Sequence, residues 1–197
     1  EAVDNVLIAL DGTPGKSKLG ANAVLGVSMA VASAVSRSVD RPLYSYLSHG
    51  RPPVLPVPLL NIVNGGKHAE NSSDVQEFMV VPAGFGTFGR ALRAGVETYH
   101  ALKELLRERG LSTTVGDEGG YAPSVSTNHE AIELILAAIE KAGYAPGTEC
   151  FIALDVAASE LLTERGTRYS FTTEGAALTS VELIERYGEW VDRYPII

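Results

Sequence analysis

The chain has 197 residues, of which 45% are hydrophobic and 20% are charged, and its formal net charge is −8. This composition is that of an ordinary globular protein, and the acidic balance argues against a nucleic-acid surface, which needs clustered Lys and Arg. No apolar run reaches the roughly 18 residues that a membrane span requires. The length allows one large domain, or one domain and part of another.

The first fifty residues have a helical pattern. Apolar side chains recur at helical spacing from Leu19 to Ala34, and the opposite face carries small residues such as Gly26 and Ser28. A helix with little charge on any side is usually buried on several sides, so we expect this one to be enclosed. Arg41 and Pro42 break the pattern before a short further element, PLYSYL.

Residues 51–58, RPPVLPVP, contain four prolines. Proline at this density resists regular structure and gives a stiff connection. We therefore predict a domain boundary here, with one domain in residues 1–50 and a second in residues 51–197.

Two apolar runs, Val57–Val63 and Val75–Val81, have the length and the β-branched residues of strands. The loop between them is too short for the crossover that parallel strands require, so we expect an antiparallel hairpin. This geometry brings His68, in the loop, to the same rim as Gln76 and Glu77, which open the second strand.

Beyond residue 111 the pattern alternates between strands and helices, which favours a parallel α/β sheet. Three strands are expected after the hairpin, at 113–115, at 150–157 and beginning at 194. Three helices alternate with them. The first spans 88–109 and is ended by Gly110, the second begins at a Thr127/Glu130 capping box and ends at Gly143, and the third begins at a Thr179/Glu182 capping box.

Two acidic residues lie where these strands end. Glu118 follows the strand at 113–115 within Asp117-Glu118-Gly119-Gly120, which is also the composition of a plain acidic turn. Asp155 ends an apolar strand, where burying an unpaired carboxylate costs several kcal/mol. We expect Asp155 to meet a cation, a lysine or several hydrogen bonds, and a structural salt bridge is the alternative to a functional role.

Four segments, in this order along the chain, resemble the enolase family: GKSKLGANAVLGVSMA, NGGKHAENSSDVQEF, VGDEGGYAP and ALDVAASE. The resemblance implies an α/β fold, a partial TIM-like (β/α) barrel that begins with an antiparallel hairpin. The helical end of an α+β N-terminal domain would precede this barrel.

The resemblance also implies a Mg²⁺-dependent hydro-lyase of glycolysis that reversibly dehydrates 2-phosphoglycerate to phosphoenolpyruvate. Asp155 matches a Mg²⁺ ligand, Glu118 the acid that helps the β-hydroxyl leave, and Glu77 its partner carboxylate at the substrate. Gln76 and His68 match residues that line the substrate pocket. A homodimer or higher oligomer, a cytoplasmic location and a secondary cell-surface pool are further implications of the family.

The single cysteine, Cys150, lies in an apolar run and is expected to be a buried, reduced thiol. Because the chain begins without methionine and ends as a strand begins, we expect it to be a piece of a longer protein. The family's lysine base, two further carboxylate ligands and a serine-bearing loop would then lie elsewhere, and this chain alone would be inactive.

Two other functions remain open from the sequence. One is a different enolase-superfamily enzyme acting on another carboxylate, which the closeness of the NGGKHAENSSDVQEF and GDEGG segments to enolase itself disfavours. The other is a non-catalytic interaction or structural protein, which the presence of Asp155, Glu118 and Glu77 disfavours.

Overall fold

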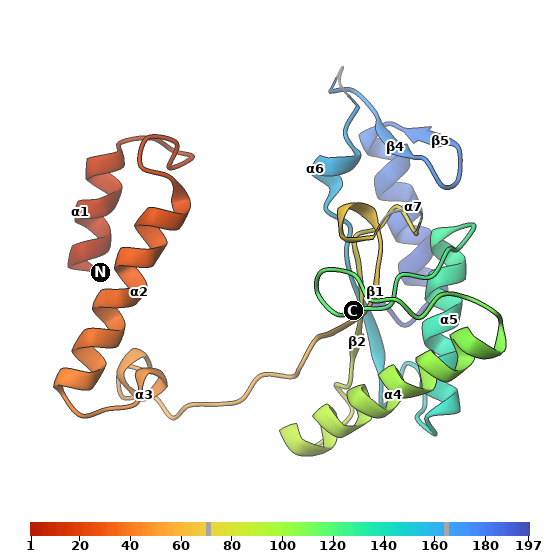
Figure 1. Cartoon of the computed structure of the whole chain (residues 1–197), viewed down its shortest axis with the longest axis horizontal. Coiled ribbons are helices and arrows are strands. Elements are labelled where there is room, and N and C mark those ends of the chain that lie inside the picture. The colour runs from red at the N-terminus through yellow and green to blue at the C-terminus, as the bar shows by residue number, and fades with distance from the viewer. Residues whose placement is uncertain (70–71, 164–165) are drawn as a thin grey trace. The chain divides into compact units, whose positions relative to one another are not determined.

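A computed structural model describes residues 1–69, 72–163 and 166–197 of the chain. These residues form two compact units, residues 1–55 and residues 56–197 (Figure 1). Among the described residues, no helix is both long and apolar enough to cross a membrane.

The first unit consists of three helices, α1 (Ala2–Asp11), α2 (Ala21–Ser38) and α3 (Leu43–Leu47). The helical pattern is therefore confirmed, but the expectation that α2 is enclosed is wrong for the described residues, among which Ser36 is the one buried residue of that helix. The physical reason is that α2 packs only on α1 and α3 within this unit, and these cover one side of it. Its apolar side chains elsewhere are exposed, namely those of Leu25, Val27 and Met29.

Asp11 fastens the end of α1 to the loop that leads into α2. Its side chain is 2% exposed, and its carboxylate accepts hydrogen bonds from the backbone N–H groups of Thr13 at 3.0 Å and Leu19 at 2.7 Å. The hydroxyl of Thr13 also donates to it, and these bonds hold the pKa of Asp11 below its ordinary value. Hydrogen bonds to the charged form have this effect because protonation would weaken them.

A three-stranded sheet organises the second unit, with β1 (Leu60–Asn64), β2 (Glu77–Val81) and β3 (Phe151–Asp155) in the order β1-β2-β3 (Figure 1). The predicted antiparallel hairpin is confirmed, because β1 pairs antiparallel with β2 from Leu60 opposite Val80 to Asn64 opposite Glu77. The strand β3 is also antiparallel to β2. The fold class is mixed α/β, as expected, and the described strands do not close into a barrel.

Three details differ from the sequence-based expectation. The predicted strand at 113–115 is wrong: Val115 forms only an isolated bridge to Tyr121, because the chain reverses in a tight turn between them. Among the described residues, the parallel pairing expected after residue 111 is limited to three isolated bridges, Val63 with Tyr121, Pro146 with Cys150 and Ile152 with Ile196. The short helix α6 (Ala158–Leu161) and the hairpin of β4 (Tyr169–Phe171) and β5 (Ala176–Leu178) were not predicted.

The helices of this unit are α4 (Phe88–Glu108), α5 (Asn128–Lys141) and α7 (Ser180–Arg193), close to their predicted bounds. Thr179 and Glu182 form the expected capping box at the start of α7. At α5 the box is only half formed. The side chain of Thr127 accepts from the N–H of Glu130, but the carboxylate of Glu130 accepts instead from the N–H of Ser126, at 2.7 Å.

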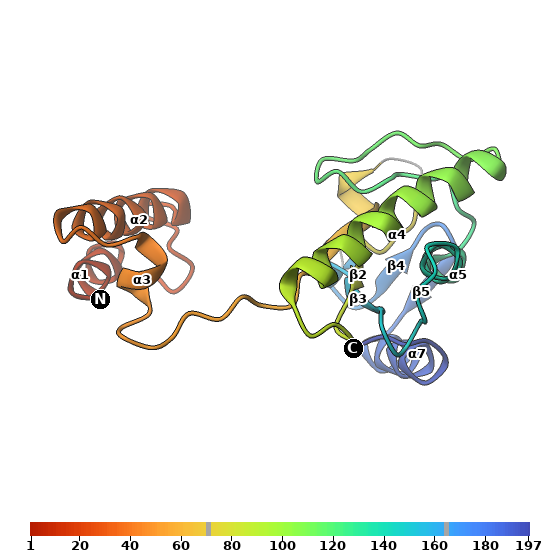
Figure 2. The same ribbon diagram turned by 90° about the horizontal axis from the view of Figure 1, so that it is seen from below.

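The core of the second unit lies where α4 and α5 pack on each other and on β2 (Figure 2). Cys150 is a free, buried thiol as predicted, and burial raises its pKa to about 11. The largest fully buried side chains are those of Trp190, Tyr121, Phe78, Phe171, Ile62, Leu102, Leu106, Ile132, Leu134, Ile135, Ile139 and Ile152.

Replacing Leu102 with alanine should lower the free energy of unfolding of the second unit by about 2–5 kcal/mol, because the side chain is 0% exposed and its loss leaves a cavity. Leu92→Ala on the same helix, where the side chain is 40% exposed, is the matched control and should cost far less. Chemical denaturation followed by the fluorescence of the single, buried Trp190 measures both. Equal losses in the two variants would contradict this description of the core.

Candidate functional site

Two carboxylates stand opposite each other at one end of the sheet. Glu77, the first residue of β2, pairs with Asp155, the last residue of β3, and on its other side Glu77 pairs with Asn64 of β1. Directly opposite residues point to the same face of a sheet, with Cβ atoms about 4.5–5.5 Å apart. Like charges in that position destabilise a sheet, so this end of β2 and β3 favours binding of a cation.

Asp155 is exposed, which corrects the expectation of a carboxylate buried at the end of an apolar strand. The strand ends at this residue, and the chain turns at once into α6, so the side chain stays in contact with solvent. One carboxylate oxygen, Oδ1, accepts a hydrogen bond from the backbone N–H of Ala157 at 2.9 Å, and Ala157 adopts a left-handed conformation with φ of 48°. This short turn holds the carboxylate at the end of β3.

Glu118 lies on the turn between Val115 and Tyr121, and its side chain is exposed. The side-chain amide of Asn61, on β1, donates to Oε2 of Glu118 at 3.2 Å. Because β1 also places Asn64 beside Glu77, this one strand connects Glu118 with the paired carboxylates of β2 and β3.

Aromatic side chains fasten this acidic turn to the sheet. The hydroxyl of Tyr99 donates to the carbonyl of Gly119 at 2.8 Å, and its ring stacks on that of Tyr121 with centroids 4.4 Å apart. The backbone of Tyr121 in turn bonds to β1 at Ile62 and Asn64. Burial raises the pKa of the Tyr121 phenol, so this ring stays neutral.

The second glycine of the turn is required by close packing. A Cβ atom at Gly120 would lie 2.3 Å from Oδ1 of Asn64 and 3.0 Å from Oδ1 of Asn61. Sequence analysis did not identify Asn61 or Tyr99. Asn61 could have been noticed as a polar residue within an apolar strand. Tyr99 looked like an ordinary apolar-face residue of the helix predicted at 88–109.

The remaining predicted residues lie on the loop between β1 and β2. Gln76 is half-buried, and its carbonyl accepts from the N–H of Gly65 at 2.9 Å. His68 ends the short 3-10 helix Gly66–His68, but its side chain lies outside the described part of the structure. Lys67 forms an ion pair with Glu160 and so links this loop to α6.

Asp155 offers the hard oxygen ligand that Mg²⁺ prefers, and Mg²⁺ commonly binds through one or two carboxylates and several waters. Within the described residues, no group of three or more His, Cys, Asp or Glu side chains is arranged to hold a metal ion. The residues present therefore fit part of a magnesium site.

Two protein-family models match the chain. Residues 52–197 match the family model described as enolase, C-terminal TIM barrel domain, and residues 1–47 match the model described as enolase, N-terminal domain. The chain belongs to the enolase family. The resemblance seen in the four sequence segments is thereby confirmed, and enolases are a family of Mg²⁺-dependent hydro-lyases of glycolysis.

Removing the hydroxyl that anchors the acidic turn, by Tyr99→Phe, should lower the free energy of unfolding by about 1 kcal/mol and speed amide exchange at Gly119 and Gly120. Tyr187→Phe is the matched control, because the Tyr187 hydroxyl is buried and finds no hydrogen-bond partner among the described residues. That control should be neutral or slightly stabilising. Thermal unfolding and hydrogen exchange measure both variants, and equal effects would show that Tyr99 does not fasten the turn.

Proposed function

We propose that this chain supplies part of an enolase active site, which reversibly dehydrates 2-phosphoglycerate to phosphoenolpyruvate with Mg²⁺ as cofactor. The observation that carries the proposal is the direct pairing of Glu77 with Asp155 at one end of the sheet. The hydrogen bond from Asn61 to Glu118 supports it, because it attaches a third acidic residue to the neighbouring strand.

Each acidic residue has a distinct proposed role. Asp155 contributes a carboxylate oxygen to the metal site from the end of β3, where its other contact is the backbone of Ala157. Bound Mg²⁺ neutralises the negative charge that develops when a proton leaves the carbon next to a carboxylate. Glu118 gives a proton to the departing β-hydroxyl, and Glu77 holds that hydroxyl from β2. Gln76 and His68 line the substrate pocket.

The reaction also needs a base to remove the substrate proton, and the residues proposed above do not include one. Lys67 is adjacent to His68 in the chain, but its ammonium group is engaged by the carboxylate of Glu160. We therefore propose that the chain does not catalyse the dehydration by itself.

The family also supports two proposals about the setting of the chain. A homo-oligomer, dimeric or larger, is common among enolases, and a cytoplasmic location with a secondary cell-surface pool is the family's pattern. The buried free thiol of Cys150 is compatible with a reducing compartment.

Asp155→Asn should weaken Mg²⁺ binding by at least about tenfold, because it removes a negative charge and a ligand oxygen. Asp192→Asn is the matched control, since Asp192 is an exposed carboxylate that belongs to α7 and not to the paired strands. Magnesium titration monitored by the amide resonances of β2 and β3 gives both affinities. An unchanged affinity in the Asp155 variant would remove this residue from the metal site.

The purified chain should show no Mg²⁺-dependent formation of phosphoenolpyruvate, because the proposed residues include no free base. Ultraviolet absorbance of phosphoenolpyruvate measures this with 2-phosphoglycerate and Mg²⁺ in excess. Turnover that disappears in Lys67→Ala or Lys103→Ala would contradict the prediction and identify that lysine as the base. Turnover that depends on neither would place the base elsewhere in the chain.

A further inference from the structure

A buried asparagine stands behind the loop that leads to Glu77. Asn128, the first residue of α5, is 0% exposed. Its Oδ1 accepts from the backbone N–H of Val75 at 3.0 Å. Its Nδ2 donates to Oδ2 of Asp74 at 3.3 Å and to Oε1 of Glu174 at 2.8 Å, and its own backbone N–H donates to that same Oε1 at 3.0 Å.

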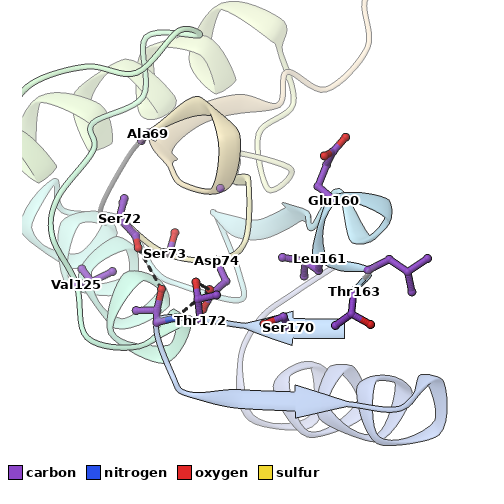
Figure 3. A pocket seen from close by; sticks show the side chains of 13 residues that line it. Ala69, Ser72, Ser73, Asp74, Val125, Glu160, Leu161, Thr163, Ser170 and Thr172 are labelled. Carbon is purple, nitrogen blue, oxygen red and sulfur yellow. Dashed lines mark hydrogen bonds between the residues drawn. The ribbon is translucent and has the colours of Figure 1, made fainter. Parts of the chain in front are cut away.

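The two carboxylates that accept hydrogen bonds from Asn128 also have other partners. Asp74 is 6% exposed, and its Oδ1 accepts from the hydroxyl of Thr172 and from the N–H of Thr173, both at 3.0 Å (Figure 3). Glu174, with 14% of its side chain exposed, pairs with Arg186 of α7 at 2.6 Å. Buried charges are costly unless they are paired and hydrogen-bonded. Here the guanidinium of Arg186 pairs with Glu174, and the amide of Asn128 donates to both acids.

This network fixes the backbone immediately before β2 from two sides. Asn128 holds the N–H of Val75, and the N–H of Gly65 holds the carbonyl of Gln76 at 2.9 Å. The approach of Gly65 is so close that a Cβ atom there would lie 2.4 Å from the carbonyl oxygen of Val75. Gln76 and Glu77 follow directly, so their place at the end of the sheet depends on these contacts.

We propose that Asn128 is a positioning residue for the candidate active site. It fixes the segment Ser72–Gln76 so that Glu77 starts β2 in register with Asp155. This role rests on the proposed function, because it matters to catalysis only if Glu77 and Asp155 belong to the site.

The chemistry of the position explains why an amide is needed. The side chain must accept from a backbone N–H and donate to two carboxylates, all without contact with solvent. Aspartate would accept but would bring a third negative charge against the other two. An apolar side chain would leave the N–H of Val75 and both acids without this partner.

A cavity of about 630 Å³ borders the network, and Ser72, Asp74 and Thr172 are among its lining residues (Figure 3). If the contacts of Asn128 were lost, Asp74 could therefore be hydrated from this cavity without unfolding of the core. The expected consequence is local loosening of the segment Ser72–Glu77, with the packing of α4 on α5 preserved.

Asn128→Ala tests the proposal with Ser180→Ala as matched control, since Ser180 is also the first helical residue after a threonine cap but is exposed. In Asn128→Ala, the amide of Val75 should exchange with solvent at least about tenfold faster, while amides in the middle of α4 keep their rates. Ser180→Ala should change neither. Equal rates for Val75 in the two variants would overturn the proposal.

Asn128→Asp adds a readout that depends on the charge of the network. Above neutral pH the introduced carboxylate faces Asp74 and Glu174, of which Glu174 is paired with Arg186, so the melting temperature should fall below that of the unsubstituted chain. Repulsion raises the pKa of the folded cluster above the unfolded values, so the deficit should shrink as the pH falls from 8 to 5 and the cluster takes up a proton. A deficit independent of pH would overturn the assignment.

Magnesium titration separates this proposal from the proposed function. At pH 8, Asn128→Asp should weaken Mg²⁺ binding relative to Ser180→Ala, because a loosened start of β2 no longer fixes the end of β3, where Asp155 lies. If the unsubstituted chain binds no Mg²⁺ at Asp155, the metal site of the proposed function is wrong, while the exchange of Val75 still decides the role of Asn128. If Asn128→Ala fails to fold, Asn128→Asp at pH 5 decides: slow exchange of Val75 supports the proposal, and fast exchange overturns it.

Discussion

The second unit depends on the pairing of one strand, β2, with a partner on each side. Both ladders are antiparallel, and both reach the residue at which β2 begins, so Glu77 has Asn64 on one side and Asp155 on the other. Register sets this arrangement, since a slip of one residue in either ladder would turn the carboxylate to the opposite face of the sheet. The apolar residues Phe78 and Val80, both 0% exposed, oppose such a slip because it would expose them.

Some carboxylates of the chain are largely buried and hydrogen-bonded, whereas others are exposed. Asp74 is buried and Glu174 is largely so, and two backbone N–H groups, one hydroxyl, an amide and a guanidinium are their partners. Asp155 and Glu118 are exposed, and their carboxylates accept hydrogen bonds from the backbone of Ala157 and from the side-chain amide of Asn61, respectively. A fully satisfied carboxylate has little capacity for a new ligand, whereas an exposed one on a fixed backbone can bind a cation or exchange a proton. This contrast is why we place the chemistry at the exposed pair and assign a positioning role to the buried network.

The acidic turn between Val115 and Tyr121 is a short segment that is fixed in position although it is largely exposed. It contains no regular strand, yet a tyrosine hydroxyl, a ring stack and two backbone bonds to β1 hold it. Gly120 permits this approach, since any side chain there would meet the amides of Asn61 and Asn64. Packing thus explains Gly120, whereas Gly119 has open space around it and is explained by its positive φ of 86°.

The sequence by itself determined the local elements and the hairpin. Apolar periodicity predicted α4, the Thr179 and Glu182 capping box predicted the start of α7, and a short loop between two apolar runs predicted the antiparallel pairing of β1 and β2. These features depend on neighbours in the chain, which the sequence shows directly. The sequence also indicated the family, through segments that carry Glu77, Glu118 and Asp155.

Only the tertiary structure determined which residues far apart in the chain contact one another. The pairing of Glu77 with Asp155, the bond from Asn61 to Glu118, and the contacts of Asn128 with Asp74 and Glu174 each link residues at least 46 positions apart in the chain. The exposure of Asp155 and of most of α2 likewise followed from which elements pack against them. Periodicity and turn chemistry report local preference, whereas register, burial and long-range hydrogen bonds depend on which surfaces meet when the chain folds.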